Sequence, residues 1–368
     1  MNEKVVFLLG DVTAKGGIEK VTITLVEELK RLLGMNSSIV SLYKSGIKPS
    51  FSCDETRIEY LSNKHETSMF NRKLGLFSGL IFDLYYIIKK SIALLKTIKK
   101  NKASIVVCCD IKMVLLAYIT SFFVQFKIVA VEHFEYDVPN SILKCLRTFL
   151  YKKISKVVIL TSEDVDKYHW LPSDKLHIIP NIVSVKKDPL IEKEKVVLAV
   201  GRLCHQKGFD ILINAWARSE ARNSDWRLEI YGDGEDKAML EGEIQSLELS
   251  NVLIKPFSSD IDKKYDMAQI FILSSRFEGL GMVLIEALAH SLPCISFDCP
   301  AGPKTIIKNN INGLLVPTGD EDKLSKSIDS LISSSEMRER FSKIAPSSIS
   351  MFNSDSVTNK WLLLFRDM

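Results

Sequence analysis

The chain has 368 residues, which is enough for two domains of about 180 residues each. Its apolar content of 46% and charged content of 26% are those of an ordinary folded protein and exclude a disordered or collagen-like chain. Seven cysteines without a Cys-x-x-Cys spacing argue against a disulfide framework and a zinc site, and they favour a reduced, cytosolic setting.

The net charge of +4 is unevenly distributed along the chain. Residues 1–185 contain 26 Lys and Arg against 18 Asp and Glu, or +8. Residues 186–368 contain 23 against 27, or −4. The first half is therefore the better candidate for contact with an acidic partner or surface.

The first predicted elements are a buried strand over residues 5–9 and a helix over 18–33, whose apolar residues recur at helical spacing. The run 5–9 is too short for a signal peptide, so none is expected. Gly16 and Gly17 stand at the helix start, where backbone amides can meet a phosphate or sugar oxygen. A simple tight turn is the alternative.

Residues 46–67 are polar with little periodicity and predict an irregular connection. Residues 70–102 are apolar and basic together, so they predict a helix that either lies on anionic lipid or packs on the core with a solvated cationic edge. The apolar residues 113–131 include polar side chains, and we interpret them as a helix and then a strand over 128–131, not a membrane span.

Strands are predicted over residues 105–109, 128–131 and 157–160. The second ends in Glu132 and His133, at a strand's carboxyl end, where a histidine is either a ligand contact or a buried core residue. A second basic apolar helix is predicted over 143–154, with cations at Lys144, Arg147, Lys152 and Lys153.

Residues 184–195 are charged, contain a proline and predict a linker. We therefore expect domains over 1–185 and 186–350, followed by a segment 351–368 with an amphipathic helix.

The second half begins with a strand over 196–200 that ends in Gly201 and Arg202, and Lys207 precedes the next helix. Two cations beside a strand end suit a diphosphate, since Arg binds through a fork and Lys as a point charge. Two solvated surface cations are the alternative.

Residues 274–317 carry the clearest pattern, with Glu278, a glycine-containing loop and Glu286 eight positions later. A strand precedes the loop and a helix follows it, so the loop lies at a strand's carboxyl end. Gly281 allows close backbone approach to a ligand, and the amides of Met282 and Val283 lie at the helix start. Glu286 is either a hydrogen-bond acceptor for paired hydroxyls, as on a ribose, or a solvated surface glutamate.

These motifs together resemble the retaining glycosyltransferases of family 4, which have the two-domain GT-B fold. The Glu278-x7-Glu286 motif, Gly16-Gly17, Gly201-Arg202 with Lys207-Gly208, and Tyr231-Gly232-Asp233-Gly234 occur in the family's order over nearly the whole chain. The resemblance implies an α/β protein of two doubly wound Rossmann-like domains facing each other across a cleft. It also implies that 1–185 is the acceptor side, 186–350 binds the nucleotide sugar and the last helix crosses back to the first domain.

The resemblance further assigns roles to the site residues. It implies that Glu278 and His133 contact the donor sugar and that Glu286 holds the ribose. It implies a diphosphate site without a metal or cofactor, formed by Arg202, Lys207, Gly281, Met282 and Val283. Gly16 and Gly17 would border the diphosphate and the acceptor.

The expected activity is retaining transfer of a hexose or N-acetylhexosamine from a nucleotide sugar, with UDP favoured, to a lipid-linked or growing surface glycan. Residues 298–307, DCPAGPKTII, resemble bacterial polysaccharide and glycolipid enzymes. We expect a cytoplasmic protein on the inner face of the membrane and no nucleic-acid partner. A nucleotide-sugar epimerase and a non-catalytic nucleotide-sugar-binding protein remain as alternatives. The loop after the first strand lacks the Gly-x-Gly-x-x-Gly of a dinucleotide-dependent oxidoreductase.

Overall fold

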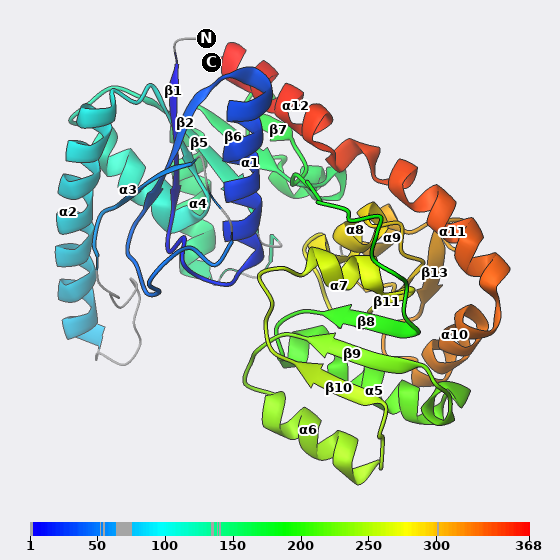
Figure 1. Ribbon diagram of the computed structural model, residues 1–368. Coiled ribbons are helices and arrows are strands. Elements are labelled where there is room, and N and C mark those ends of the chain that lie inside the picture. Colours follow the sequence, from blue (N-terminus) through cyan, green and yellow to red (C-terminus); the bar gives the residue numbers. More distant parts are fainter. Residues whose placement is uncertain are drawn as a thin grey trace. The chain divides into compact units, whose positions relative to one another are not determined.

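The computed structural model describes residues 3–51, 53, 56–63, 76–133, 136–137, 139, 141–299 and 302–368, without the side chains of 76–81. Contacts between elements divide the chain into two compact units. Unit 1 comprises Met1–Ile182 and Ser354–Met368, and unit 2 comprises Val183–Asn353. The last helix of the sequence therefore belongs to the unit that contains the first strand (Figure 1).

Unit 1 is built on a sheet of seven parallel strands in the order β3-β2-β1-β4-β5-β6-β7. The order grows outward in two directions from β1 and β4, which makes this pair the switch point of the sheet. The strands are β1 (Lys4–Leu9), β2 (Asn36–Ser41), β3 (Arg57–Tyr60), β4 (Ile105–Cys108), β5 (Lys127–Glu132), β6 (Lys156–Ile159) and β7 (Leu176–Ile178).

Helices cover both faces of this sheet because successive side chains of a strand point to opposite faces. Phe7 of β1 packs edge-to-face on Trp361 of α12 (Ser354–Arg366), with ring centroids 6.0 Å apart, and α12 also packs on α1 (Gly17–Leu33). Val6 and Leu8 belong instead to a core with residues of α2 (Leu76–Asn101), α3 (Ile111–Ser121) and α4 (Ser141–Lys153). A short 3-10 helix, η1 (Ser162–Tyr168), follows β6.

The expectation of an irregular connection over residues 46–67 was wrong, because β3 forms within it, and β2 was not predicted. The sequence of β2 is Asn-Ser-Ser-Ile-Val-Ser, yet its serines are buried. Two of the hydroxyls are satisfied by backbone carbonyls: Ser37 donates to Val26, and Ser41 to Tyr43 at 2.8 Å. Short side-chain hydrogen bonds of this kind let a polar strand be buried.

The basic helix expected over 70–102 is α2, and the expected positions 70–75 lie outside the described residues. Its buried residues are Asp83, Tyr86, Lys90, Ser91, Leu94 and Ile98. The ammonium of Lys90 donates to the carbonyl of Leu42 at 3.1 Å. The apolar residues Leu84, Ile88 and Ile92 are exposed instead, so much of the apolar stripe points away from the core.

Unit 2 repeats the arrangement with six parallel strands in the order β10-β9-β8-β11-β12-β13, and its switch point lies between β8 and β11. The strands are β8 (Val196–Val200), β9 (Arg227–Tyr231), β10 (Val252–Lys255), β11 (Ile270–Leu273), β12 (Cys294–Phe297) and β13 (Gly313–Val316).

Two separate apolar cores lie on the two faces of this sheet. Val197 and Ile272 pack with residues of α5, α6 and α10, whereas Leu198 and Phe271 pack with residues of α7 and α8. The helices are α5 (Phe209–Arg218), α6 (Lys237–Ser246), α7 (Asp262–Met267), α8 (Met282–Ala289), α9 (Pro303–Ile306), α10 (Glu321–Ser333) and α11 (Ser335–Ser348), with the 3-10 helices η2 (His205–Lys207), η3 (Glu220–Asn223) and η4 (Ser350–Phe352).

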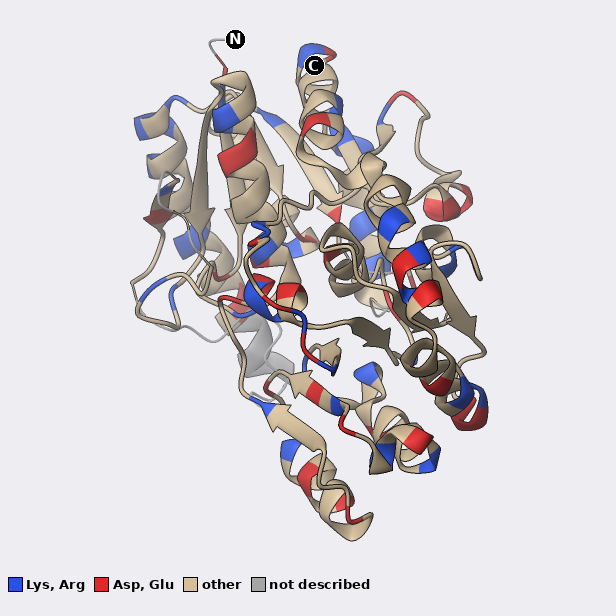
Figure 2. Ribbon diagram, turned by 45° about the vertical axis from the view of Figure 1, so that its right-hand side comes forward, with Lys and Arg blue, Asp and Glu red and all other residues tan. Residues whose placement is uncertain are grey.

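Both units are doubly wound α/β structures, so the expected fold class is confirmed. The strands are largely free of charged residues, which lie mainly on helices and loops (Figure 2). Within the described part of the chain, none of the helices combines the length and the apolar character needed to span a membrane.

Candidate functional site

The loops that follow β8 and β11 leave the sheet of unit 2 at its switch point, where open α/β sheets bind ligands. The first loop contains Gly201, Arg202 and Lys207, and the second contains Glu278 and Gly281. Because the two strands pair directly, both loops start at the same edge of the sheet.

Lys207 and Glu278 form a close ion pair, with 2.6 Å between Nζ and Oε1. Both side chains are largely buried, with 17% and 7% of their surfaces exposed. Ser275 Oγ donates a second hydrogen bond of 2.6 Å to the same carboxylate oxygen. The Lys207 side chain passes close to Gly201, where an added Cβ would lie 3.2 Å from its Cδ. Residues that follow both strands, Gly201 after β8 and Ser275 after β11, therefore fix the geometry of the ion pair.

A second ion pair joins the loop after β11 to the start of α5, which follows the loop after β8. The guanidinium of Arg276 binds the Asp210 carboxylate through two hydrogen bonds, of 2.9 and 2.5 Å, and also donates to the carbonyl of His205 at 2.7 Å. Ser274 Oγ donates to the carbonyl of Lys207 at 3.0 Å. Burial alone would raise the pKa of Asp210, but the hydrogen bonds from Arg276 hold that pKa below its usual value. We call this ion pair the Arg276–Asp210 clip.

The turn after β9 lies directly against the loop after β8. A Cβ added to Gly232 would overlap the carbonyl oxygen of Gly201, and one added to Gly234 would overlap that of Leu203. The amide of Leu203 donates to the carbonyl of Asp233 at 2.9 Å. The glycines are therefore required by close backbone packing, which supports the loop that carries Arg202.

Helix α8 begins at Met282, immediately after Gly281, whose φ of +72° is a left-handed conformation that glycine adopts at little cost. The amide of Leu284 is bonded to the carbonyl of Gly281 at 2.9 Å. The amides of Met282 and Val283 precede it in the first turn, where helix amides lack carbonyl partners within the helix. This start is the part of α8 suited to an anion.

Glu286 lies one turn further along α8 and is buried. The hydroxyl of Tyr265, on α7, lies 3.3 Å from Glu286 Oε2 and equally far from the carbonyl of Val283. Burial raises the pKa of Tyr265 well above its usual value, and the charge of Glu286 adds to that shift. The carboxylate is therefore not the solvated surface group that was the alternative reading of the sequence.

His290, four residues after Glu286, connects α8 to α7 from the same helix face. Its Nδ1 lies 2.6 Å from Asp266 Oδ1, its Nε2 lies 3.4 Å from Asp262 Oδ1, and its ring stacks on Tyr265 with centroids 5.3 Å apart. These contacts fix the position of Tyr265 and, through it, the environment of Glu286.

Cys299 follows β12 and brings a third strand end to the site. Burial raises the pKa of its thiol to about 12, the charge of Glu278 adds to the shift and Lys207 opposes it. At neutral pH the thiol is therefore protonated and acts as an apolar neighbour of the ion pair. The adjoining expected positions 300 and 301 lie outside the described residues.

In unit 1, Gly16 caps the start of α1 and Gly17 is its first residue. The loop after β1 is fixed by Asp11, whose carboxylate accepts hydrogen bonds from the backbone and hydroxyl of both Thr13 and Ser45. Burial alone would raise the pKa of Asp11, but these bonds hold the pKa below its usual value. The carboxylate therefore braces the loop that leads to Gly16.

His133 directly follows β5 and lines a cavity of about 20 Å³ together with Thr22, Cys109, Asn181 and Trp361, among others. Burial lowers the pKa of His133 to about 4, so its imidazole is neutral at pH 7. A neutral ring can both donate and accept a hydrogen bond.

Glu132, next to His133, is the centre of a buried polar cluster. Arg147 donates to its carboxylate at 3.0 Å, Tyr168 at 2.8 Å and Tyr151 at 2.6 Å. The Arg147 guanidinium also lies 3.9 Å from the ring centre of Tyr136. Arg147 is one of the cations of the basic helix predicted over 143–154, and its side chain is only 2% exposed.

The structure thus brings Lys207 and Glu278 into contact, with Glu286 and the amides of Met282 and Val283 on the adjoining helix. Arg202 is exposed on its loop and is not paired with Glu278. Gly16, Gly17 and His133 belong to unit 1.

Sequence reasoning missed Asp210, Arg276, Tyr265 and His290. Two of them had a signal in the sequence: Asp210 follows the Lys207-Gly208 pair by two residues, and His290 shares a helix face with Glu286. The described residues contain no group of three or more His, Cys, Asp or Glu side chains placed to hold a metal ion.

The chain matches known sequences and structures over most of its length. Residues 183–348 match the family Glycosyl transferases group 1. The amylovoran biosynthesis glycosyltransferase AmsD of Erwinia amylovora is 32% identical over 251 residues, which cover 65% of this chain and 70% of that protein. A second relative is an α-1,4-N-acetyl-D-galactosaminyltransferase of Campylobacter jejuni, which is named for an undecaprenol-diphosphate-linked acceptor. It is 27% identical over 285 residues, which cover 76% of this chain and 79% of that protein.

Among solved structures, Anabaena HepE in complex with UDP and glucose aligns with a TM-score of 0.81 over 100% of both chains at 17% identity. At that identity the likeness concerns the fold alone, and with the two parallel sheets it confirms the GT-B class. The identity to AmsD and the family match over unit 2 go further and show that the chain belongs to the glycosyl transferases group 1 family.

Proposed function

We propose that the protein transfers a hexose or N-acetylhexosamine from a UDP-sugar to a hydroxyl of a lipid-linked or growing surface glycan, with retention of configuration, as a family 4 enzyme. The observation that carries the proposal is the buried Lys207–Glu278 pair beside the start of α8 at the switch point of unit 2. Cation, carboxylate and free helix amides are the groups that a sugar diphosphate requires there.

The chemistry follows from where charge develops during transfer. Departure of UDP builds negative charge on the β-phosphate while the sugar becomes oxocarbenium-like. Lys207, Arg202 and the amides of Met282 and Val283 are preorganised donors for that charge, since the Arg276–Asp210 clip already fixes their loops. The chain's own cations then stabilise the leaving group, and we propose that no metal ion is needed.

The two carboxylates take different parts. Glu278 is placed to accept hydrogen bonds from sugar hydroxyls while it is paired with Lys207. Glu286, one turn into α8, accepts hydrogen bonds from the ribose hydroxyls, and Tyr265 orients it. His133 contacts the donor sugar as a neutral imidazole, because its pKa of about 4 keeps it uncharged at pH 7.

The names of the relatives support the choice of donor and acceptor. The HepE structure is a complex with UDP and glucose, the Campylobacter relative is named for a lipid-linked acceptor, and AmsD is named for amylovoran biosynthesis. We further propose that unit 1 provides the acceptor side and unit 2 the nucleotide-sugar side. A lipid-linked acceptor also favours a cytoplasmic protein attached peripherally to the inner face of the membrane.

The proposal is tested by incubating the protein with a panel of UDP- and GDP-sugars, with and without undecaprenyl-diphosphate-linked glycans. We expect release of UDP from one donor, faster with acceptor, and a product whose anomeric configuration by NMR matches that of the donor. Lys326→Met, an exposed lysine on α10, is the control for Lys207→Met. An isomerised nucleotide sugar without transfer would identify an epimerase, and tight binding without turnover would identify a binding protein.

A further inference from the structure

Unit 1 exposes a group of large apolar side chains on one side of its sheet. They lie on α2, directly after α3 and on α4, the three helices that share the core of Val6 and Leu8. They are Leu84, Tyr85, Ile88, Ile92, Phe122, Phe123, Ile142 and Phe149. We call this surface the α2–α4 face.

The α2–α4 face is continuous because its helices pack in sequence, α2 on α3 and α3 on α4. On α2, Leu84, Ile88 and Ile92 follow one another at four-residue intervals and therefore line one side of the helix. Tyr118 of α3 connects the rest, with its ring 5.1 Å from Phe122 and 6.4 Å from Phe149 between centroids.

The side chains of this face are more exposed than apolar residues at the margin of a hydrophobic core would be. Ile88 and Ile92 are 52% and 50% exposed, and Phe122 and Phe123 are 70% and 68% exposed. Contiguous exposed apolar patches on a soluble protein mark an interaction surface.

The exposed charged residues on the three helices have one sign. Lys89, Lys96 and Lys99 are exposed on α2, and Lys152 and Lys153 on α4. The sequences of the three helices contain a single acidic residue, Asp83, and its side chain is buried. A second copy of this face would meet like charge, whereas an anionic surface would meet complementary charge.

We propose that the α2–α4 face docks on an anionic lipid bilayer. The apolar side chains enter the boundary between headgroups and acyl chains, and the lysines contact lipid phosphates. This inference deepens the proposed function and rests on it in one respect, since a lipid-linked acceptor would lie in the same bilayer. It does not depend on which sugar is transferred.

Vesicle flotation of the full-length protein tests the proposal, using phosphatidylglycerol–phosphatidylcholine vesicles and pure phosphatidylcholine vesicles at low and high salt. We expect binding to the anionic vesicles at low salt and weak binding in the other conditions, because salt screens the surface potential. The double variant Ile88→Ser with Ile92→Ser should bind at least about tenfold more weakly, because it removes buried apolar area. Lys96→Gln with Lys99→Gln should bind about 25-fold more weakly, since each cation contributes about fivefold.

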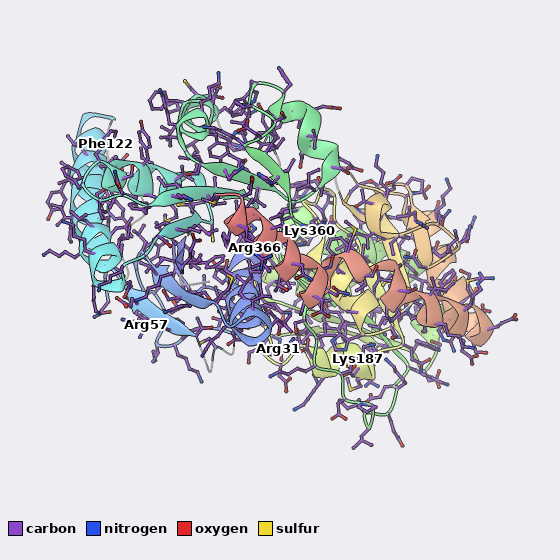
Figure 3. All side chains as sticks on the ribbon, turned by 90° about the horizontal axis from the view of Figure 1, so that it is seen from above. Arg31, Arg57, Phe122, Lys187, Lys360 and Arg366 are labelled. Carbon is purple, nitrogen blue, oxygen red and sulfur yellow. The ribbon has the colours of Figure 1, made fainter. Side chains whose placement is uncertain are left out.

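Matched controls lie on other surfaces. Leu363→Ser removes an apolar side chain that is 63% exposed on α12, and Lys326→Gln with Lys343→Gln removes two exposed lysines of unit 2. Figure 3 shows Phe122 at the outer edge of unit 1, away from Lys360 and Arg366, which bracket Leu363 on α12. Both controls should bind as the wild type does.

Equal binding to neutral and anionic vesicles, or equal loss in the controls, would overturn the proposal. So would a stable dimer, seen by sedimentation, that the Ile88→Ser with Ile92→Ser variant dissolves, because the face would then be an interface between copies. UDP release from a soluble donor is measured in parallel on the same samples. Loss of flotation with donor turnover retained separates a wrong docking surface from a wrong enzymatic function.

Discussion

At the scale of single residues, the contact between Lys207 and Glu278 changes what each can do. Each side chain is largely buried, so removal of one partner leaves an uncompensated charge in the site. The lysine is therefore held ready by the carboxylate and is not a freely moving surface cation. Substitution of either residue is expected to disturb the other, and variants of the two should not be additive.

We predict that Lys207→Ala and Arg202→Ala each reduce the turnover number by about 10²–10³, the usual effect of removing one preorganised donor to developing charge. Excess EDTA should leave the wild type active, because these cations stabilise the leaving diphosphate. Steady-state UDP release measures both effects, with Lys326→Ala as the control. The diphosphate assignment fails if EDTA abolishes transfer and Mg²⁺ or Mn²⁺ restores it.

Glu286→Ala should weaken donor binding by about 1.5–3 kcal/mol, the range for hydrogen bonds to a charged group. Isothermal calorimetry with the UDP-sugar measures the change, and circular dichroism checks the fold. Glu241→Ala, a glutamate on α6 with a side chain that is 54% exposed, is the control. Unchanged donor affinity in Glu286→Ala would remove this carboxylate from the site.

At the scale of elements, the site depends on connections between loops more than on the loops alone. The Arg276–Asp210 clip joins the loop after β11 to the start of α5, and the bond from Ser274 to Lys207 reinforces it. The two charged groups that we assign to the sugar and the diphosphate are thus positioned by residues that need not touch the substrate.

We predict that Arg276→Gln lowers the free energy of unfolding by about 1 kcal/mol at pH 7, the upper range for a partly exposed ion pair. Because the pKa of Asp210 in the folded state lies below its unfolded value near 4, the pair contributes its stability above about pH 4 and loses it as the pH falls through the folded value. Urea unfolding at pH 7 and pH 3 should show the difference between variant and wild type shrinking. A constant difference would contradict an ionic contribution.

We predict that replacement by alanine has opposite effects on stability at two glycines of unit 2. Gly232→Ala should destabilise the protein by about 1–3 kcal/mol, since its Cβ would overlap the carbonyl oxygen of Gly201. Gly242→Ala, in the interior of α6 with open space around it, should stabilise by about 0.5–1 kcal/mol. Thermal unfolding compares the two, and similar shifts in both would show that close packing at Gly232 is not the cause.

The sequence predicted elements well where apolar periodicity and burial coincide, as in β1, α1, β11 and α8. It failed where polar or charged residues are buried in the folded structure. Ser37 and Ser41 of β2 are buried because backbone carbonyls accept their hydrogen bonds, and Arg147 is buried because it pairs with Glu132 at the end of β5. For the site, motif positions predicted Lys207 and Glu278 although they lie 71 positions apart. They did not predict Asp210 or Tyr265, which belong to none of the motifs and reach the site only through the packing of α5 and α7.

At the scale of the whole molecule, α12 completes the core of unit 1. Trp361 and Phe365 of this helix are buried, and Lys156 of β6 pairs with Asp367 at 2.5 Å. Trp361→Ala should therefore destabilise unit 1 by about 3–5 kcal/mol. Hydrogen exchange should show faster exchange in the described parts of 3–182 and unchanged exchange in 183–353. Equal acceleration in both ranges would contradict this assignment of α12.

The place of α12 in the sequence also constrains how the protein is made. During translation the strands of unit 1 emerge first, yet the helix that covers Phe7 leaves the ribosome only after all of unit 2. Domains generally fold as their chain emerges, so unit 2 is complete while unit 1 still exposes an apolar sheet face. The nascent chain therefore exposes one apolar face of the sheet of unit 1 while unit 2 is being synthesised. We expect chaperones to bind the nascent chain mainly during that period.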